Sequence, residues 1–163
     1  MPPPYDGQYP QPGRSTRRRP PGFGGSKASM GDDLRIGGIL ETVLYCTSEN
    51  ERETRTFYEG VLGLRPVGLG GDAFRVAEKQ MVLLFNAETS SIQDDPPPHG
   101  ATGPVHTCFV VAADDYDRWK RRLRDKGVTV TREISWPNGM QSFYFEDPAG
   151  NVLEIADGDL WPR

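Results

Sequence analysis

Three side chains that can bind a metal stand apart in otherwise apolar runs of the sequence. Glu41, His106 and Glu154 each interrupt a stretch of aliphatic, aromatic or β-branched residues. Burying an unpaired carboxylate is costly, and two carboxylates in one cleft would repel each other. A divalent cation between them would remove both costs. One imidazole and two carboxylates would leave about three octahedral positions for a substrate that chelates through two oxygens.

Each of these residues also has an ordinary structural interpretation. His106 could be a hydrogen-bonded histidine of the core, and Glu154 could be a strand carboxylate at the rim of a sheet. Glu41 could be a polar cleft residue or a general base rather than a ligand. His99, on the Pro-rich segment before His106, could cap the site, reach the metal or simply be an exposed loop histidine.

The elements that must position these residues come in the same order twice. A strand, a helix and three strands are predicted in each half, and Glu41 and His106 match in a repeat of about 65 residues. The expected strands, rich in β-branched and aromatic residues, are 39–46, 65–67, 73–77 and 81–85, then 105–111, 128–134, 142–146 and 152–156.

Helix boundaries are also visible in the sequence. Ser48 and Glu51 have the spacing of a capping box, and Asp114 or Asp115 can cap the second helix. Gly63 and Gly127 are expected where the two helices end, since glycine adopts the left-handed conformation there. The helix residues Tyr116 and Trp119 are expected to face the sheet as part of the core.

Strand alternation places the candidate ligands on defined faces. Glu41 shares a face with Tyr45, and His106 shares one with Cys108. Glu154 faces away from its two aliphatic neighbours. Each candidate ligand is therefore a polar side chain on a strand that is otherwise apolar.

Three segments carry a resemblance to a known family. Residues 57–64 (FYEGVLGL) look like its FY-x-x-VLGL helix end, and residues 103–111 (GPVHTCFVV) look like its GPGH-x-x-F-x-V strand. Residues 143–155 (FYFEDPAGNVLEI) look like its F-x-DP-x-GN-x-x-E closing hairpin. In this order and spacing the chain resembles the vicinal-oxygen-chelate superfamily, which includes glyoxalases, bleomycin resistance proteins and extradiol dioxygenases.

This resemblance implies the fold. It implies an α+β domain in which two βαβββ modules form a curved mixed sheet around a cleft. We expect the domain at 34–163, with modules at about 38–86 and 104–157 and a linker at 87–103.

The resemblance also implies a ligand set of Glu41, His106 and Glu154 for one divalent metal ion, which could be Fe, Mn, Ni, Zn or Co. Many relatives have histidine at the position of Glu41. A fourth ligand position is expected near Leu84, where residues 81–85 offer no ligand chemistry. That gap counts against glyoxalase I activity and favours the three-ligand relatives, the extradiol dioxygenases and fosfomycin thiol transferases.

The first functional hypothesis is a metal-dependent lyase, isomerase or dioxygenase that acts on a small oxygen-chelating substrate. Glu154 or Glu41 could then act as catalytic groups that move protons. The alternative is a metal-free protein of the bleomycin resistance type that sequesters a small molecule. A third possibility is an accessory protein that keeps the fold without chemistry. By resemblance we also expect a homodimer, with modules exchanged so that each site takes ligands from two chains.

Substrate-binding residues are expected on strands and loops that border the cleft. Arg75 could pair with an anionic substrate, and Trp136 could form a wall of the cleft. The full expected set is Tyr45, Phe74, Arg75, Trp136 and Tyr144.

Composition limits the other possibilities. Residues 1–33 hold seven Pro and six Gly without apolar periodicity, so we expect a disordered tail rich in Pro, Gly and Arg. The tail carries a net charge of +2 and the remainder −6, which sum to the −4 of the chain. An acidic domain does not attract nucleic acid, and no apolar run suits a membrane span. Cys46 and Cys108 stand alone, as in a reduced cytoplasmic protein.

Overall fold

The computed structural model describes residues 36–68 and 70–161 of the chain. The chain divides into two units, residues 1–36 and 37–163, and the second unit carries the fold described below. The predicted disordered tail at 1–33 lies outside the described residues. None of the described helices combines the length and apolar character that a membrane span requires.

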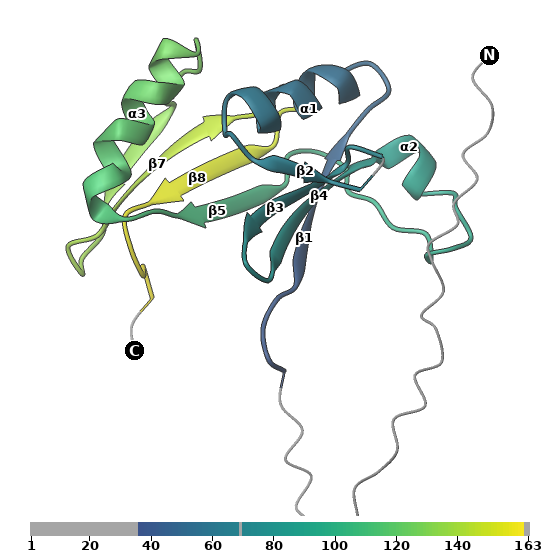
Figure 1. Cartoon of the computed structure of the whole chain (residues 1–163), viewed down its shortest axis with the longest axis horizontal. Helices are drawn as coiled ribbons and strands as arrows, with labels where there is room; N and C mark the ends of the chain where they lie inside the picture. The colour runs from purple at the N-terminus through teal and green to yellow at the C-terminus, as the bar shows by residue number, and fades with distance from the viewer. Residues whose placement is uncertain (1–35, 69, 162–163) are drawn as a thin grey trace, which may run out of the picture. The chain divides into compact units, whose positions relative to one another are not determined.

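The second unit contains two copies of a βαβββ arrangement, as predicted (Figure 1). The first copy has β1 Glu41–Cys46, α1 Glu51–Gly60, β2 Arg65–Val67, β3 Ala73–Ala77 and β4 Gln80–Asn86, followed by the short helix α2 Ala87–Ser90. The second copy has β5 His106–Val110, the 3-10 turn η1 Ala113–Asp115, α3 Tyr116–Asp125, β6 Arg132–Ser135, β7 Gln141–Glu146 and β8 Val152–Ala156.

The strands form two four-stranded mixed sheets. Sheet A has the order β1-β4-β3-β2, and sheet B has the order β5-β8-β7-β6. In each sheet the first and last strands of a module pair in parallel, and the other pairs are antiparallel. Among the described strands, ladder hydrogen bonds run only within each sheet. The predicted curved sheet is therefore built as two sheets.

Helices α1 and α3 cover one face of the two sheets. Each sheet therefore has a core face, which lies toward the helices, and an opposite face, which we call the cup face. Figure 1 shows α1 and α3 on the same side of the strands. Phe57 of α1 contacts Phe145 of β7, with ring centroids 6.4 Å apart, so the core joins the two modules. Tyr116 lies in this core as predicted, and Trp119 packs against it. The largest fully buried side chains are Tyr58, Phe74, Phe143, Phe145, Leu44, Leu84, Leu123, Leu153 and Ile155.

Several local predictions need correction. The capping box does not form, because the Ser48 hydroxyl donates to Glu88 and α1 begins at Glu51 with Asn50 as its N-cap. Asp115 is the N-cap of α3, but it pairs with Arg118 rather than with a backbone amide.

The strand predicted at 128–134 begins only at Arg132. Val128 and Val130 instead pack against the core from an extended segment without a ladder partner. Gly63 and Gly127 have φ values of +70° and +78°, which confirms the left-handed conformations expected near the helix ends.

Candidate functional site

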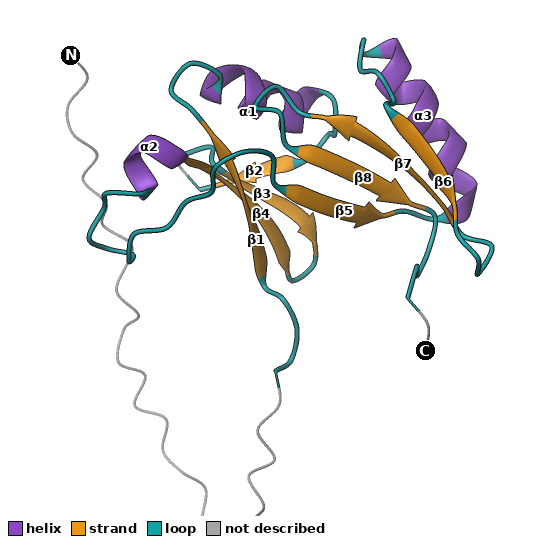
Figure 2. Ribbon diagram, turned by 180° about the vertical axis from the view of Figure 1, so that it is seen from behind, coloured by secondary structure: helices purple, strands orange, loops and turns teal. Residues whose placement is uncertain are grey.

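The cup face of sheet B brings two of the candidate ligands together. Cys108, Glu154 and Tyr144 lie side by side on β5, β8 and β7, because they are partners in the two ladders. His106 precedes Cys108 on the same face. Its Nε2 atom lies 3.2 Å from Oε2 of Glu154. Figure 2 shows the order of these strands, β5-β8-β7, from behind.

Within the described part of the chain, one oxygen of the buried Glu154 carboxylate has no hydrogen-bond partner. Glu154 is 4% exposed, and its Oε1 atom has no hydrogen-bond partner in the described structure. Its ion-pair partner is the imidazole of His106, whose side chain is 51% exposed. A buried carboxylate oxygen without a partner costs free energy, and a cation bound there would remove that cost. The imidazole nitrogen and the carboxylate are the donor types that Fe(II), Mn, Ni, Zn and Co accept.

Two further polar groups lie beside this carboxylate. Partial burial, and then the Glu154 carboxylate, raise the pKa of the Cys108 thiol to about 12, although the residue as a whole is exposed. Burial, and next the interaction with the Glu154 carboxylate, raise the pKa of the Tyr144 phenol. The Tyr144 ring also stacks on the imidazole of His106, with centroids 5.9 Å apart. Thiol and phenol therefore stay protonated at neutral pH, next to the candidate ligands.

Glu41 lies on the other sheet. It is exposed at the start of β1, which is an edge strand of sheet A. A cavity of about 200 Å³ runs between this edge and β5, and Glu41, Met81 and Cys108 are among its lining residues. Within residues 36–68 and 70–161, no three His, Cys, Asp or Glu side chains lie close enough to hold a metal ion. One chain therefore pairs two candidate ligands, and the third ligand stays a prediction.

The strand register specifies which residue within 81–85 stands at the missing fourth ligand position. Cys108 pairs with Glu154 in sheet B, and the matching pair in sheet A is Val43 with Leu83. Leu83 is therefore the counterpart of Glu154, whereas Leu84 is 2% exposed in the core. The conclusion that this strand offers no ligand is unchanged, because Leu83 is also aliphatic.

The predicted substrate-binding residues fall into different environments. Tyr144 lies in the site, and Trp136 donates through Nε1 to the Ser142 hydroxyl at 2.9 Å, on the same cup face. Arg75 pairs with Met81 in the ladder, and its guanidinium donates to the Glu78 carbonyl at 3.1 Å.

Phe74 lies in the core instead. It is 0% exposed and stacks on Tyr58, with ring centroids 5.4 Å apart. It faces the helix side of β3, where Val82 of β4 is its ladder partner. A substrate in the cleft cannot contact this ring.

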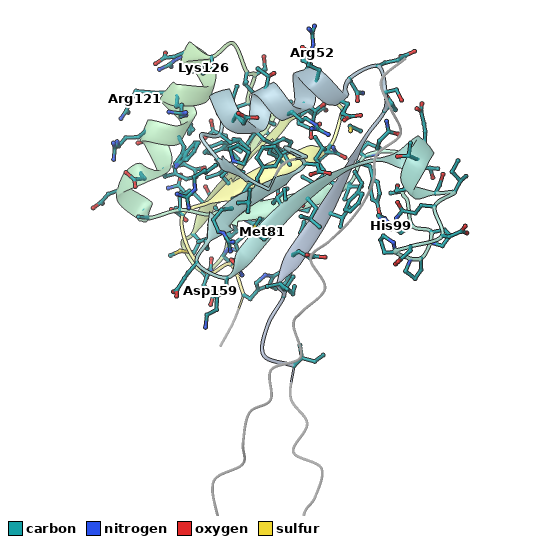
Figure 3. The ribbon with its side chains drawn as sticks, turned by 45° about the vertical axis from the view of Figure 1, so that its right-hand side comes forward. Arg52, Met81, His99, Arg121, Lys126 and Asp159 are labelled. Carbon is teal, nitrogen blue, oxygen red and sulfur yellow. The ribbon has the colours of Figure 1, made fainter. Side chains whose placement is uncertain are left out.

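The Pro-rich linker contributes a histidine to the face that carries Glu41. Nδ1 of His99 lies 2.9 Å from the hydroxyl of Tyr45, and its ring meets Phe85 edge-on at 4.7 Å. The His99 amide donates to the carbonyl of Ser90 at 3.0 Å. Figure 3 labels His99 on its loop beside α2. The sequence left three roles open for His99, as a cap over the site, a metal ligand or an exposed loop histidine, because nothing local signals a contact with a residue 54 positions away.

Replacing His99 with alanine is expected to release this linker without unfolding the domain. The variant loses the Tyr45 hydrogen bond and the packing on Phe85, which together hold the loop on the sheet. Amide hydrogen exchange at residues 91–105 should become roughly tenfold faster, while global stability falls by about 1 kcal/mol. A His99→Phe variant, which keeps a ring on Phe85, should show an intermediate rate. Unchanged exchange in His99→Ala would mean that His99 does not anchor the loop.

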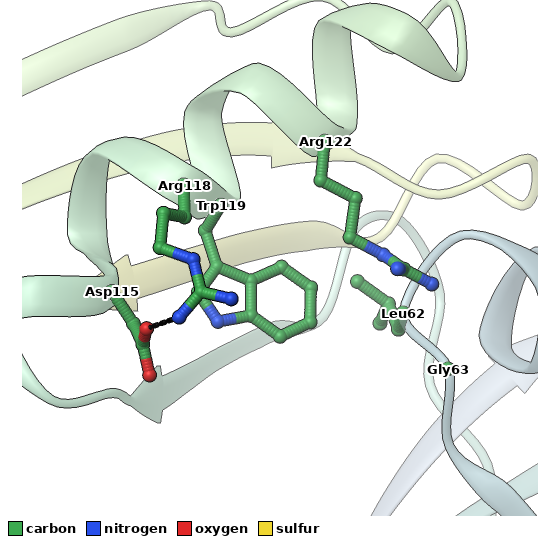
Figure 4. Close-up of a pocket in the computed structure, with 6 residues that line it drawn as sticks. All are labelled: Leu62, Gly63, Asp115, Arg118, Trp119 and Arg122. Atoms are coloured by element: carbon green, nitrogen blue, oxygen red, sulfur yellow. Dashed lines mark hydrogen bonds and ion pairs between the residues drawn. The ribbon is translucent and has the colours of Figure 1, made fainter.

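Another cavity, of about 450 Å³, lies between α3 and the segment after α1 and is a poor candidate for chemistry. Arg118 pairs with Asp115 (Figure 4). The Arg122 guanidinium donates from Nε to the Val61 carbonyl at 2.6 Å, where it caps the C-terminal end of α1. The residues that line this cavity are Leu62, Gly63, Asp115, Arg118, Trp119 and Arg122. Both arginines and Asp115, the one carboxylate among the lining residues, are already engaged in hydrogen bonds or an ion pair, so this cavity offers no unpaired group for chemistry.

Comparison with known proteins identifies the family. Residues 46–155 match the model of the Glyoxalase/Bleomycin resistance protein/Dioxygenase superfamily. A lactoylglutathione lyase structure from Agrobacterium tumefaciens is 38% identical, with a TM-score of 0.70, and the match covers 78% of this chain and 98% of that one. An integron cassette protein from V. cholerae is 26% identical, with a TM-score of 0.58, over 76% of this chain and 96% of that one.

A curated relative matches a shorter stretch. Glutathione transferase FosA from Serratia marcescens is 37% identical over 59 residues, which are 36% of this chain. The match spans 40% of the length of that relative. The model match covers more than half of this chain, and both sheets have the architecture expected of the family. The chain belongs to the Glyoxalase/Bleomycin resistance protein/Dioxygenase superfamily.

Proposed function

We propose that this protein is a divalent-metal-dependent enzyme of the lyase, isomerase or dioxygenase type that acts on a small oxygen-chelating substrate. His106 and Glu154 would hold the metal. The observation that carries the proposal is the buried Oε1 atom of Glu154, which has no partner and belongs to a carboxylate 3.2 Å from the His106 imidazole. The ligands suit Fe, Mn, Ni, Zn or Co.

The surrounding residues support the binding of a polar substrate. A metal held there would supply a Lewis acid for vicinal oxygens of the substrate. The raised pKa values of Cys108 and Tyr144 keep both groups protonated at neutral pH, so they would be hydrogen-bond donors beside Glu154 rather than catalytic acids. Trp136, which is held by its hydrogen bond to the buried Ser142 hydroxyl, would form a wall on the same face. Glu41, which is exposed, is free to act as a third ligand or as a general base.

We further propose that the third ligand comes from a second copy of the chain. Glu41 starts an edge strand, and the described part of one chain holds no cluster of three ligand side chains. In a homodimer with exchanged modules, Glu41 of one chain would meet His106 and Glu154 of the other.

The two unpaired cysteines are consistent with a reducing compartment such as the cytoplasm.

The two-chain arrangement has a direct test. Glu41→Ala and His106→Ala variants, each defective alone, are mixed, unfolded and refolded together. Half of the resulting dimers should be heterodimers, in which one of the two sites carries neither substitution, so about a quarter of the metal capacity should return. A monomer in light scattering, or a mixture with no recovery, would overturn the exchanged dimer.

The names of two relatives guide the choice of substrate. Both the lyase and the transferase are named for glutathione. Adducts of this tripeptide and small 2-oxo or 2-hydroxy compounds are therefore the first substrates to screen.

A bleomycin-resistance-type binding protein is the alternative. The cup face of sheet A is lined by apolar and aromatic side chains, among them Val43, Tyr45, Leu83 and Phe85. Residues 34–163 carry a net charge of −6, which favours a cationic ligand. This alternative needs no metal.

Metal content separates the two functions. Protein purified without a His tag or chelators is compared with a His106→Ala/Glu154→Ala double variant by inductively coupled plasma mass spectrometry. The enzyme proposal expects about one transition metal per chain, lost in the variant. No metal in either protein, even after anaerobic reconstitution with Fe(II), Mn, Ni and Zn, would overturn it in favour of the binding protein.

A further inference from the structure

Asn151 is a buried side chain that joins three strands. It is 2% exposed and lies directly before β8. Its Nδ2 atom donates to the Tyr45 carbonyl at 2.9 Å and to Oδ2 of Asp147 at 2.8 Å. Its Oδ1 atom accepts a longer hydrogen bond from the Val105 amide at 3.4 Å. Both amide protons and the carbonyl oxygen are therefore in use, and the side chain has one orientation.

Two of these bonds, to Tyr45 and from Val105, reach segments that carry candidate ligands. Tyr45 lies on β1, on the same strand as Glu41. Val105 is the residue before His106, and Asn151 itself leads into the strand of Glu154. No backbone ladder joins sheet A to sheet B among the described strands. The Asn151 side chain therefore makes a hydrogen-bonded connection between the sheets that the backbone ladders do not make.

The connection is held by a second layer of buried groups. Oδ1 of Asp147 accepts a hydrogen bond from the backbone amide of Asn151 at 2.9 Å. The Tyr58 hydroxyl, from α1, donates to the other oxygen at 2.8 Å. Asp147 is 5% exposed and Tyr58 is 0% exposed, so water does not compete for these bonds.

We propose that Asn151 is a positioning residue for the metal site, an inference that rests on the proposed function. Metal ligands must be held within about 0.5 Å, and loss of a supporting hydrogen bond typically weakens metal binding about 10- to 100-fold. In a two-fold dimer, the distance between Glu41 and the His106–Glu154 pair within each chain determines whether the three ligands can meet at both sites. Asn151 sets that distance.

The test measures Co(II) binding to the full chain by titration and by its visible absorption spectrum, which reports coordination geometry. Asn151→Ala is expected to weaken Co(II) binding about tenfold and to change the spectrum. Tyr58→Phe, which keeps the ring and removes one hydrogen bond, should weaken binding about two- to threefold in the same direction. Leu123→Ala is the control, because Leu123 is a fully buried core residue of α3, so its truncation destabilises the fold at a residue of another element.

The outcomes separate positioning from stability. Folded Asn151→Ala with the affinity and spectrum of the unsubstituted protein would overturn the inference. The same loss in Leu123→Ala, at an equal fall in thermal midpoint, would also overturn it, since stability alone would then explain the effect. If Asn151→Ala does not fold, an unchanged Tyr58→Phe overturns it. Failure of the unsubstituted protein to bind Co(II) would be seen separately and would remove the proposed site itself.

Discussion

Replacing Glu154 with leucine is expected to remove metal binding while the metal-free domain keeps or gains stability. The substitution deletes a ligand, so Co(II) affinity should fall by at least about 100-fold. It also deletes a buried carboxylate whose Oε1 atom has no partner, and the half-exposed imidazole left behind can be solvated by water, so an apolar side chain in this place is expected to be neutral or stabilising by about 1 kcal/mol. A functional residue that costs stability is the pattern expected of a binding site.

Both effects are measured on one protein, by Co(II) titration and by urea unfolding after treatment with EDTA. Glu59→Leu, at an exposed carboxylate of α1, is the matched control and should change neither quantity beyond about 0.5 kcal/mol. Loss of more than about 1 kcal/mol in metal-free Glu154→Leu would show that the carboxylate is structural. Unchanged Co(II) affinity would remove Glu154 from the site.

Replacing Asp147 with alanine is expected to give a large loss of stability, about 3–5 kcal/mol. The carboxylate accepts four hydrogen bonds at 2.8–2.9 Å, two from backbone amides and two from side chains. Burial, and then the Asp147 carboxylate, raise the pKa of Tyr58, whose hydroxyl therefore remains a donor. The variant leaves buried donors without an acceptor.

Chemical unfolding followed by circular dichroism measures the loss, with Asp125→Ala as the control at an exposed carboxylate of α3. The Asp125 variant should stay within about 0.5 kcal/mol of the unsubstituted protein. A loss of less than about 1 kcal/mol in Asp147→Ala would mean that the connection between the modules contributes little to the fold.

Local patterns in the sequence predicted the fold because they repeat. Alternation on the strands placed His106 and Glu154 on the correct faces, and glycines marked where both helices end. The predictions that failed depend on contacts between distant residues. Ser48 donates to Glu88, 40 positions away, instead of capping α1. Phe74 faces the core because of the helix above it, which strand periodicity alone does not specify.

Part of the candidate site could also be predicted from local patterns in the sequence. The His106–Glu154 pair follows from two motifs within one module, whereas the linkage of His99 to Tyr45 depends on the path of a Pro-rich loop. The hydrogen bonds of the Asn151 side chain to Tyr45 and Val105 were not predicted from the sequence. An asparagine after Gly150 already fits the turn of the hairpin, so nothing in the sequence pointed to a longer-range contact. The proposal that a second chain supplies the third ligand rests on the family resemblance, because nothing in the pattern of one chain indicates it.

The most direct measurement is anomalous X-ray diffraction at the cobalt edge from crystals grown with Co(II). The proposed site predicts a peak within about 2.0–2.2 Å of Nε2 of His106 and a carboxylate oxygen of Glu154, with Glu41 of a second chain completing the set. A peak at another place, such as His99, or no peak at full Co(II) loading, would contradict the metal site on which the proposed enzyme depends.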